Sequence, residues 1–470
     1  MTDDEGNPMG ARVDVDLAII GSGGAAMAAG ITARQHGASA VLIERSVVGG
    51  TCVNVGCVPS KTLLAAAGAR HGAATNPFSG APTAAHGVDF AALVRQKDDL
   101  VGLLRDTKYV AVAAAHGFEI RRGEARFANR ETLVVDGEPL RARAYVVATG
   151  AEPARLALPG LDGIDVLTST TAMEQKELPE SLVVIGAGYV GMEQAQLFAH
   201  LGTEVTLVGR LAPRAEPELA EVLRQVFAGD GINVIEEHAA TVEHHRGGSQ
   251  VTTTSGKHAT GERLLVATGR QPRTASLDLA VAGVNCDAAG FITVDHSQRS
   301  SNPRVFAAGD VSGAPQFVYV AAAAGRVAAL NALGVGNDQP AQVDYTGLPS
   351  VIFIRPQLAS AGLTEAEALR AGVRCECKVL ALAEVPRALA NHDTRGAVKL
   401  VADADTGKLL GAHAVAEGAG EMMLAVTYAI RAGMTVDDIA DTWAPYLTMA
   451  ESLRIAAGLY RNQMPTSCCA

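Results

Sequence analysis

The sequence predicts an α/β fold with two parallel-sheet units, followed by a C-terminal α+β domain. An apolar strand, a glycine-rich turn and a helix follow one another at 15–37, and the same order recurs at 181–200. From about Gly347 onward, strand-like and helix-like runs alternate without such a turn, which is typical of an α+β domain. A chain of 470 residues is long enough for roughly two to four domains of ordinary size.

Composition and charge indicate a globular protein that binds small molecules. Hydrophobic residues make up 48% of the chain and charged residues 19%, which is enough apolar material for a large core. The formal net charge of -11 disfavours nucleic acid and anionic membrane surfaces, which are themselves negatively charged. No apolar run is long enough to span a bilayer, and the polar, acidic N-terminus is unlike a signal peptide. We therefore expect a cytoplasmic protein without membrane insertion.

The first unit begins with an apolar strand at 15–20, which we expect to be buried in a parallel sheet. Gly21, Gly23 and Ala26 then occupy the small-residue positions of a dinucleotide-binding turn, where the backbone must approach a pyrophosphate closely. The next strand ends in Glu44, where such a unit places the carboxylate that binds ribose hydroxyls. Because strand, turn, helix and acid are all in register, the sequence predicts a complete Rossmann-like nucleotide site.

The second unit repeats the pattern after a strand at 181–185. Gly186, Gly188 and Gly191 form its turn, and a helix and a second strand at 204–208 follow. The sequence therefore contains two Rossmann-like dinucleotide units, and apolar runs that end in Val-Ala-Thr-Gly supply a closing strand for each.

The two units differ in charge at the end of their second strand. Glu44 suits a ribose with free hydroxyls, whereas the second unit has Gly209 at the matching offset, followed by Arg210 and Arg214. A guanidinium at about 4 Å from a phosphate gains roughly 4 kcal/mol before desolvation, and a carboxylate there would repel the phosphate. The second unit is therefore predicted to bind NADPH rather than NADH. The alternative is that both arginines are exposed loop residues.

The segment from Gly49 to Lys61 holds a Cys-x4-Cys pair, Cys52 and Cys57, between a Gly-Gly-Thr and a Pro-Ser-Lys. This segment resembles the redox-active disulfide of the pyridine nucleotide–disulfide oxidoreductase family, and the resemblance covers almost the whole chain from Val15 on. It implies a disulfide between Cys52 and Cys57 at a helix start, where the helix dipole and Lys61 favour the reactive thiolate. Two inert buried cysteines would not need these flanking residues.

The same resemblance implies FAD in the first unit and NADPH in the second. Cys57 would contact the flavin, Cys52 would face the substrate, and Lys61 would pair with Glu193 beside the flavin; the alternative for Glu193 is ordinary helix surface charge. Asp310, which ends a Phe-Ala-Ala-Gly-Asp motif, would bind the ribityl chain. The residues implied for FAD are Gly21, Gly23, Ala26, Glu44, Gly50, Thr51, Lys61, Ala125, Thr149, Gly150, Asp310 and Val318. Those implied for the NADPH side are Gly186, Gly188, Gly191, Glu193, Arg210, Arg214 and Gly269.

Two features near the C-terminus make the chain resemble the mercuric reductase branch of this family. Disulfide-reducing members carry a histidine general acid where this chain has Tyr446, and a phenol with a pKa of about 10 is a poor proton donor at neutral pH. Mercuric reductases are similar to this chain in having tyrosines at the positions of Tyr446 and Tyr189. Cys468 and Cys469 form an adjacent pair, and thiolate sulfur suits a soft metal ion.

The resemblance implies reduction of Hg(II) to Hg(0), a detoxification of mercury. Cys468 and Cys469 would take the metal from mercury(II)–thiol complexes and pass it to Cys52 and Cys57 of the partner subunit in a homodimer. Many mercuric reductases carry a further N-terminal Cys-x-x-Cys domain that this sequence lacks, so we expect metal to arrive on small thiols or from another protein. Two rivals stay open: a disulfide or lipoamide reductase, which Tyr446 disfavours, and a non-enzymatic mercury-binding protein, which two intact nucleotide sites disfavour.

The other cysteines have no predicted chemistry. Cys286 lies in a turn-like stretch, and Cys375 and Cys377 lie on a probable strand edge with no third ligand nearby in the sequence. We predict these parts of the chain: a flexible N-terminus at 1–13, an FAD-binding domain at 14–152 and 273–346, an NADPH-binding domain at 153–272, a dimerisation domain at 347–462 and a mobile Cys-Cys tail at 463–470.

Overall fold

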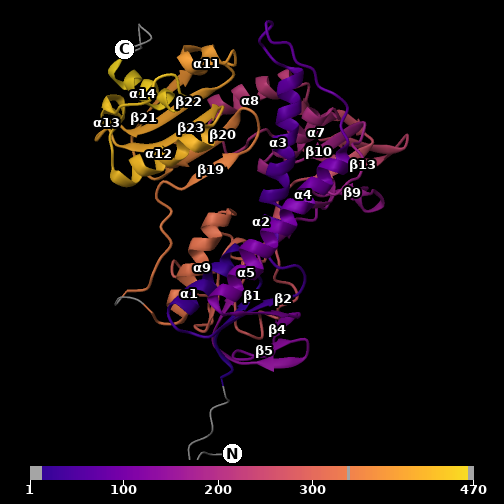
Figure 1. Ribbon diagram of the computed structural model, residues 1–470, viewed down its shortest axis with the longest axis vertical. Coiled ribbons are helices and arrows are strands. Elements are labelled where there is room, and N and C mark those ends of the chain that lie inside the picture. The colour runs from indigo at the N-terminus through magenta and orange to yellow at the C-terminus, as the bar shows by residue number, and fades with distance from the viewer. Residues whose placement is uncertain (1–12, 336–338, 464–470) are drawn as a thin grey trace, which may run out of the picture. The chain divides into compact units, whose positions relative to one another are not determined.

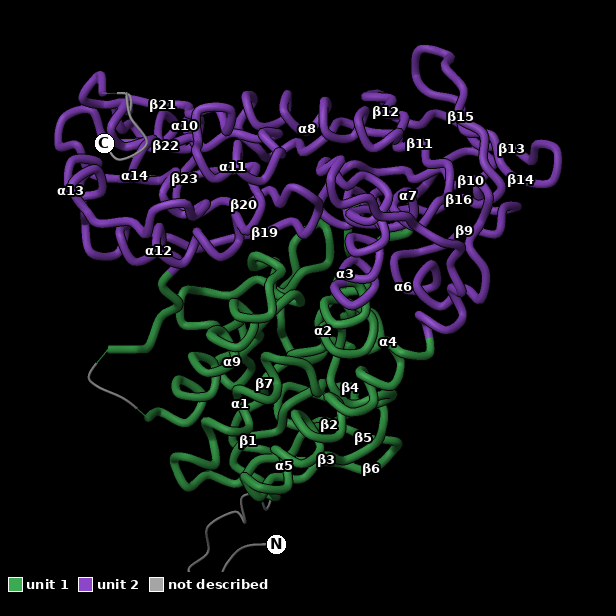
Figure 2. The backbone as a smooth tube through the Cα atoms, turned by 45° about the horizontal axis from the view of Figure 1, so that its top comes forward, with its two compact units in different colours: residues 1–60, 95–155, 269–344 green, residues 61–94, 156–268, 345–470 purple. Residues whose placement is uncertain are grey.

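The chain passes back and forth between two compact units. The computed structural model describes residues 13–335 and 339–463. Unit 1 comprises residues 1–60, 95–155 and 269–344, and unit 2 comprises residues 61–94, 156–268 and 345–470 (Figure 2). The finer domain boundaries predicted from the sequence stay a prediction.

Unit 1 is built on a parallel sheet with the strand order β18-β7-β1-β2-β3. Leu17, Ala18 and Ile19 of β1 are fully buried, as expected for a strand covered on both faces. The register sets Leu17 opposite Ala40, which confirms the two strands predicted for the first nucleotide unit. The strands are β1 (Val15–Ile20), β2 (Ala40–Glu44), β3 (Glu119–Arg122), β7 (Ala142–Val147) and β18 (Val305–Ala307).

Two helices of unit 1, α1 (Gly24–Gln35) and α9 (Val318–Ala332), lie side by side (Figures 1 and 2). A Cβ atom added to Gly325 would lie 2.1 Å from the carbonyl oxygen of Ala25, so only glycine permits this approach. α9 therefore packs closely against α1. Unit 1 also contains α2 (Gly50–Asn54), a π-helical turn η1 (Asp106–Val110), α5 (Ala111–His116), η3 (Asp310–Ser312), the antiparallel strands β4 (Ala125–Phe127), β5 (Leu133–Val135) and β6 (Glu138–Leu140), and the pair β8 (Ala151–Pro153) and β17 (Arg270–Pro272).

Unit 2 contains a second parallel sheet, with the order β12-β11-β10-β16-β9. Its central strand β10 is fully or nearly fully buried from Leu182 on, and it pairs with β11 on one side and β16 on the other. This confirms the second nucleotide unit. The strands are β9 (Val166–Leu167), β10 (Ser181–Ile185), β11 (Glu204–Val208), β12 (Asn233–Ile235) and β16 (Arg263–Val266), and an antiparallel sheet of β13 (Ala239–His245), β14 (Gly248–Thr253) and β15 (His258–Gly261) follows β12. The helices of unit 2 are α6 (Ser169–Ala172), α7 (Tyr189–Leu201) and α8 (Pro217–Gly229), with a short turn η2 (Leu161–Gly163). α3 (Cys57–Ala74) and α4 (Phe90–Arg105) each have residues in both units.

The C-terminal part of unit 2 is an antiparallel sheet with helices, which confirms the predicted α+β domain. The first strand of this sheet ends at Ile352, because the backbone N–H of Phe353 donates a hydrogen bond to the carboxylate of Glu193 instead of to a neighbouring strand. The strand order is β19 (Pro349–Ile352), β20 (Gln357–Gly362), β23 (Leu409–Ala416), β22 (Ala397–Asp403) and β21 (Cys375–Ala381). The helical elements are α10 (Glu365–Arg370), η4 (Leu382–Glu384), α11 (Pro386–Ala390), α12 (Ala419–Ala432), α13 (Val436–Asp441), α14 (Glu451–Gly458) and η5 (Leu459–Arg461).

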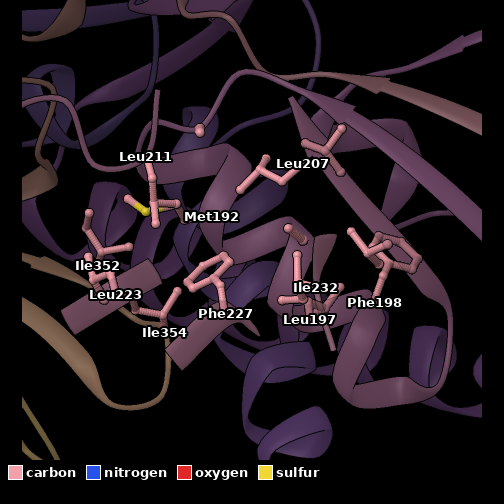
Figure 3. Packing of buried hydrophobic residues seen from close by; sticks show 14 of the residues in the cluster. Met192, Leu197, Phe198, Leu207, Leu211, Leu223, Phe227, Ile232, Ile352 and Ile354 are labelled. Atoms are coloured by element: carbon pink, nitrogen blue, oxygen red, sulfur yellow. The ribbon is translucent and has the colours of Figure 1, made fainter. Parts of the chain in front are cut away.

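One hydrophobic core inside unit 2 packs α7 and α8 against the parallel sheet and the C-terminal sheet. Figure 3 shows Phe198 of α7 and Phe227 of α8 among the side chains of this core, together with Ile352 and Ile354 from the start of the C-terminal sheet. Burying such side chains stabilises the fold by about 1.5 to 3 kcal/mol each. Among the described residues, no helix is both long and apolar enough to cross a bilayer.

Candidate active site

The glycine turn of unit 1 has the geometry of a phosphate cradle. Gly21 has a φ of +110°, and a Cβ there would lie 2.4 Å from the carbonyl oxygen of Ala148. A Cβ on Gly50 would lie 2.6 Å from the Cα of Gly23, so two glycines let the start of α2 approach the start of α1. Ala26 is buried in the first turn of α1. The unpaired N–H groups at the start of α1 can therefore meet an anionic group at close range.

Glu44 is held in place at the end of β2. The hydroxyl of Ser22 donates a hydrogen bond of 2.6 Å to Glu44 Oε2, and the backbone N–H of Ser46 donates one of 2.8 Å to Oε1. Ser22 Oγ in turn accepts a hydrogen bond from the backbone N–H of Gly49. The carboxylate is thus fixed beside the glycine turn, where it fits the ribose hydroxyls of a dinucleotide.

The other residues implied for FAD in unit 1 come from several separate segments. Thr149 and Gly150 follow β7, the strand next to β1. Val318 begins α9 close to the glycine turn, since a Cβ on Gly24 would lie 3.1 Å from its side chain. Ala125 begins β4 and is buried within a hydrophobic cluster. The fold brings Val318 to the turn, whereas Ala125 contributes to the core.

Arg270 is a buried cation that the sequence analysis missed. Its Nε lies 3.8 Å from Asp310 Oδ2 and has no hydrogen-bond acceptor within the described part of the chain, while Nη2 donates to the carbonyl of Ala151. Burial lowers the pKa of Arg270, against the attraction of Asp310 and of Cys57. Burial also raises the pKa of Asp310, against the attraction of Arg270. A buried donor without an acceptor fits an oxygen-rich ligand such as FAD, and its position directly after Gly269 was the available signal.

The two redox-type cysteines lie on consecutive helices of the predicted segment. Cys52 is partly buried in α2, and Cys57 is exposed as the first residue of α3. The side-chain amide of Asn54 donates hydrogen bonds to the carbonyls of Val48 and Gly50, and its oxygen accepts one of 2.8 Å from Arg105 Nε. The backbone between the cysteines is therefore held rigidly, and Cys57 faces the positive end of a helix dipole.

Tyr109 is a second residue that the sequence analysis missed. It lies in the π-helical turn η1, and such turns are frequent at functional sites. Burial, together with the negative charges of Cys52 and Cys57, raises the pKa of Tyr109 to about 12. The phenol therefore stays protonated near the sulfur pair and can act only as a neutral hydrogen-bond donor there. No residue pattern around 106–110 marks this role.

The ion pair predicted between Lys61 and Glu193 is present in unit 2. Lys61 Nζ lies 2.8 Å and 3.0 Å from the two carboxylate oxygens of Glu193, which is buried in α7. Phe353 contacts both partners: its backbone N–H donates a hydrogen bond of 2.9 Å to Glu193, and its ring centroid lies 4.6 Å from Lys61 Nζ. The position of this pair beside a flavin stays a prediction.

The glycine turn of unit 2 has the same geometry as that of unit 1. Gly186 has a φ of +105°, and a Cβ there would lie 2.4 Å from the carbonyl oxygen of Ala267. A Cβ on Gly191 would lie 1.7 Å from the carbonyl oxygen of Gly186, and Gly188 precedes the first residue of α7. Because glycine has no Cβ, the backbone at these positions can turn closely, and a second dinucleotide can approach the start of α7.

The residues that distinguish the second nucleotide site are accessible. Gly209 follows β11 with a φ of +142°, and both Arg210 and Arg214 are exposed. Arg214 and Tyr189 line a small cavity with side chains of the C-terminal sheet, among them Ser350. Two exposed cations without a carboxylate at the end of the second strand fit a nucleotide that carries an additional phosphate. Gly269, with a φ of +131°, precedes β17 in unit 1.

The predicted metal-handling residues near the C-terminus are only partly described. Tyr446 is about half exposed between α13 and α14. Cys468 and Cys469 lie outside the described residues, so their role as metal ligands stays a prediction.

The remaining cysteines have surroundings that disfavour metal binding. Cys375 and Cys377 lie on β21, which is an edge strand of the C-terminal sheet, as predicted. Burial, together with the charges of Glu365 and Cys375, raises the pKa of Cys377 to about 12, so its thiolate is suppressed. Burial and Asp287 raise the pKa of Cys286 in the same way.

Known proteins resemble this chain over almost its full length. The sequence model of the pyridine nucleotide-disulphide oxidoreductase family matches residues 15–325, and the model of that family's dimerisation domain matches residues 348–457. A mercuric reductase of Streptomyces lividans is 49% identical over 473 aligned residues, covering 98% of this chain and 99% of that protein. A mercuric reductase of Bacillus cereus is 46% identical over 99% of this chain and 74% of its own length.

A solved structure resembles the protein as well. The HOCl-induced flavoprotein disulfide reductase RclA from Escherichia coli superimposes with a TM-score of 0.84 at 30% identity, covering 94% of this chain and 99% of that chain. Two glycine-built nucleotide turns, a Cys-x4-Cys pair at a helix start and a family match over most of the sequence lead to one conclusion: the chain belongs to the pyridine nucleotide-disulphide oxidoreductase family.

Proposed function

We propose that this protein is an NADPH-dependent flavoprotein that reduces Hg(II) to Hg(0). The observation that carries this proposal is the identity of 49% and 46% to two mercuric reductases over nearly the whole chain. The match to the dimerisation domain at 348–457 supports a homodimer.

The residues of unit 1 fit FAD. The glycine turn can receive the pyrophosphate, Glu44 can bind the ribose, and the buried Nε of Arg270 together with Asp310 offers polar partners to the rest of the cofactor. When bound, FAD supplies a two-electron carrier between a nicotinamide and a disulfide. In unit 2, Arg210 and Arg214 fit the additional phosphate of NADPH.

The sulfur pair would hold the metal during its reduction. Two electrons open a disulfide between Cys52 and Cys57 and yield two sulfur ligands, which soft Hg(II) prefers. Attraction to Cys57 acts to raise the pKa of Arg270, so Arg270 in turn stabilises negative charge on that sulfur. The protonated phenol of Tyr109 can donate a hydrogen bond to it. A second pair of electrons, supplied by NADPH by way of the bound flavin, would then reduce Hg(II), and the neutral atom would leave because it binds thiolate weakly.

The adjacent thiols Cys468 and Cys469 of the partner subunit would deliver the metal. Two neighbouring thiols exchange with the thiols of an incoming mercury complex at high effective concentration. Tyr446 and Tyr189 would line the path of the metal.

The test follows NADPH oxidation and loss of mercury to the gas phase in one reaction with Hg(II) and excess thiol. Coupled loss is expected for the wild type. A Cys57→Ser variant should bind mercury and fail to release it as vapour, and Cys286→Ser serves as the matched control with normal turnover.

A disulfide reductase is the rival candidate, favoured by the likeness to RclA. If oxidised glutathione or lipoamide supported NADPH oxidation and Hg(II) did not, the disulfide reductase would replace the mercuric reductase. If Cys57→Ser protected cells from mercury as well as the wild type does, the protein would act by sequestration.

A further inference from the structure

Two histidines and an aspartate meet in unit 2, and none of them takes part in the proposed reaction. His71 lies in the last turn of α3, His200 lies near the end of α7, and Asp230 follows the last residue of α8. One potential ligand atom from each lies within 4.8 Å of the others. His200 Nε2 is 3.0 Å and His71 Nε2 is 3.7 Å from a carboxylate oxygen of Asp230. Three separate helices thus contribute one side chain each to a single point.

This cluster, His71–His200–Asp230, is buried except on one side. The side chains of His200 and Asp230 are 3% and 2% exposed, and that of His71 is 20% exposed. Gln196 Nε2 donates a hydrogen bond of 2.8 Å to Asp230 Oδ2, which fixes the carboxylate from behind. Ions could therefore enter past His71 and meet an oriented carboxylate, a feature that metal sites share.

One cation competes for the same carboxylate. Arg395 Nη1 lies 3.3 Å from Asp230 Oδ1, but Asp393 already binds Arg395 through two hydrogen bonds of 2.8 Å. The contact with Asp230 is the longest of the three, and the Arg395 side chain is exposed enough to turn toward water. A bound ion would have to displace this contact and the hydrogen bond of 3.0 Å between His200 Nε2 and Asp230 Oδ2.

We propose that His71, His200 and Asp230 form a metal site for a borderline divalent ion such as Zn(II). Two imidazoles and one carboxylate suit Zn(II), whereas soft Hg(II) prefers thiolate, so this site would discriminate against the metal that the cysteines would handle. The two rings are stacked, with centroids 3.7 Å apart and planes at 14°. On binding, the more exposed ring of His71 turns so that both nitrogens point at the ion, and water completes the coordination.

Bound zinc would join α3, α7 and α8 at one point. α3 begins at Cys57 and α7 carries Glu193, so the ion would stabilise two helices that bear residues of the proposed redox machinery. The site stands on the geometry of unit 2 and does not depend on the proposed reaction.

The test uses the flavin-loaded full-length protein, stripped with a chelator and with its accessible thiols alkylated. Zn(II) is added in competition with a chromophoric chelator, and X-ray absorption at the zinc edge identifies the ligands. We expect one equivalent of zinc with nitrogen and oxygen ligands only, and a higher thermal midpoint with zinc. His71→Gln should bind zinc about tenfold more weakly or worse. His238→Gln, an exposed histidine of the same unit, should behave like the wild type.

Asp230→Asn provides a second variant, because it keeps the shape of the side chain and removes its charge. It should also lose zinc, and circular dichroism reports whether each variant is folded. Unchanged zinc affinity in folded His71→Gln and Asp230→Asn would overturn the site, as would sulfur ligands at the zinc edge or no zinc binding by the wild type. Mercury reduction is measured separately, so its absence would leave this result unaffected.

Discussion

Single side chains determine the chemistry at both ends of the proposed electron path. At the sulfur end, the buried Arg270 and the protonated Tyr109 surround a pair of cysteines whose own segment was readable from the sequence. At the nucleotide end, one unit has the carboxylate of Glu44 where the other has Gly209, followed by Arg210 and Arg214. The cysteines and Glu44 could be predicted because their neighbours in sequence carry the signal. Tyr109 could not, because it reaches the cysteines only through folding.

Reversing the two exposed arginines should change the nucleotide preference. In Arg210→Glu/Arg214→Glu, the additional phosphate of NADPH meets two carboxylates, whereas NADH has no phosphate there. Because both sites are exposed, each contact contributes about 1 kcal/mol, and the ratio of kcat/KM for NADPH to that for NADH should fall at least about tenfold. Steady-state kinetics with both nucleotides measures this ratio. Arg370→Glu, which reverses one exposed arginine on α10, is the control for a single charge reversal outside the site, and an unchanged ratio in the double variant would exclude this site for the phosphate.

Helices and strands formed where the pattern predicted them, because apolar runs and glycine turns are local signals. Both nucleotide units and the C-terminal α+β domain are confirmed. The end of β19 at Ile352 has no signal in the local sequence, because the backbone of Phe353 donates to Glu193, a residue far away in sequence. Contacts between distant segments therefore change where an element ends, whereas the local sequence decides whether the element forms.

The approach of α1 to α9 predicts opposite effects for two glycine substitutions. Gly325→Ala places a methyl group 2.1 Å from the carbonyl oxygen of Ala25, so the helices must separate and the free energy of unfolding should fall by about 1 to 3 kcal/mol. Gly102→Ala in α4 meets no atom within 4 Å and should raise it by about 0.5 to 1 kcal/mol. Urea titration measures both. If both variants changed the free energy of unfolding by the same amount, the close contact between α1 and α9 would not contribute to stability.

Lys399 joins α8, α10 and β22 through a fully buried ammonium group. Its Nζ lies 2.9 Å from Glu216 Oε2, 2.9 Å from Glu218 Oε1 and 2.7 Å from Glu365 Oε2. Lys399→Met leaves Glu216 buried without its partner, so the free energy of unfolding at pH 7 should fall by about 3 to 5 kcal/mol. Lys176→Met, at an exposed lysine, should change it by less than about 0.5 kcal/mol.

The ion pair between Lys399 and Glu365 predicts that the free energy of unfolding depends on pH. The hydrogen bond from Lys399 lowers the pKa of Glu365 below its ordinary value of 4.5, so this stabilisation is present above pH 4.5 and is lost as the pH falls. Carboxylates raise the pKa of Lys399, so its own contribution persists through neutral pH. The stability difference between the wild type and Lys399→Met should therefore narrow below about pH 4.5. A constant difference down to pH 3 would contradict the pairing.

At the scale of the whole molecule, the association of two chains should be visible in one fluorophore. Trp443 is the single tryptophan of the sequence, it lies within the dimerisation-domain match, and it is 97% exposed. Leu424 and Tyr428 of α12 are exposed on the same domain. If these side chains are covered by a second copy, the emission of Trp443 should shift to longer wavelength on dilution. Leu424→Glu should give the long-wavelength emission at all concentrations, and sedimentation supplies the independent measure of mass.

Phe353 contacts both Lys61 and Glu193, and it belongs to a third segment of the chain. The C-terminal domain is therefore not an interchangeable module. A chimera that takes everything after Gly347 from a relative would keep a backbone N–H at position 353, but it would lose the ring beside Lys61 wherever that relative lacks an aromatic residue there. Recombination between members of the family should thus succeed most often when the crossover carries Phe353 together with the first two segments.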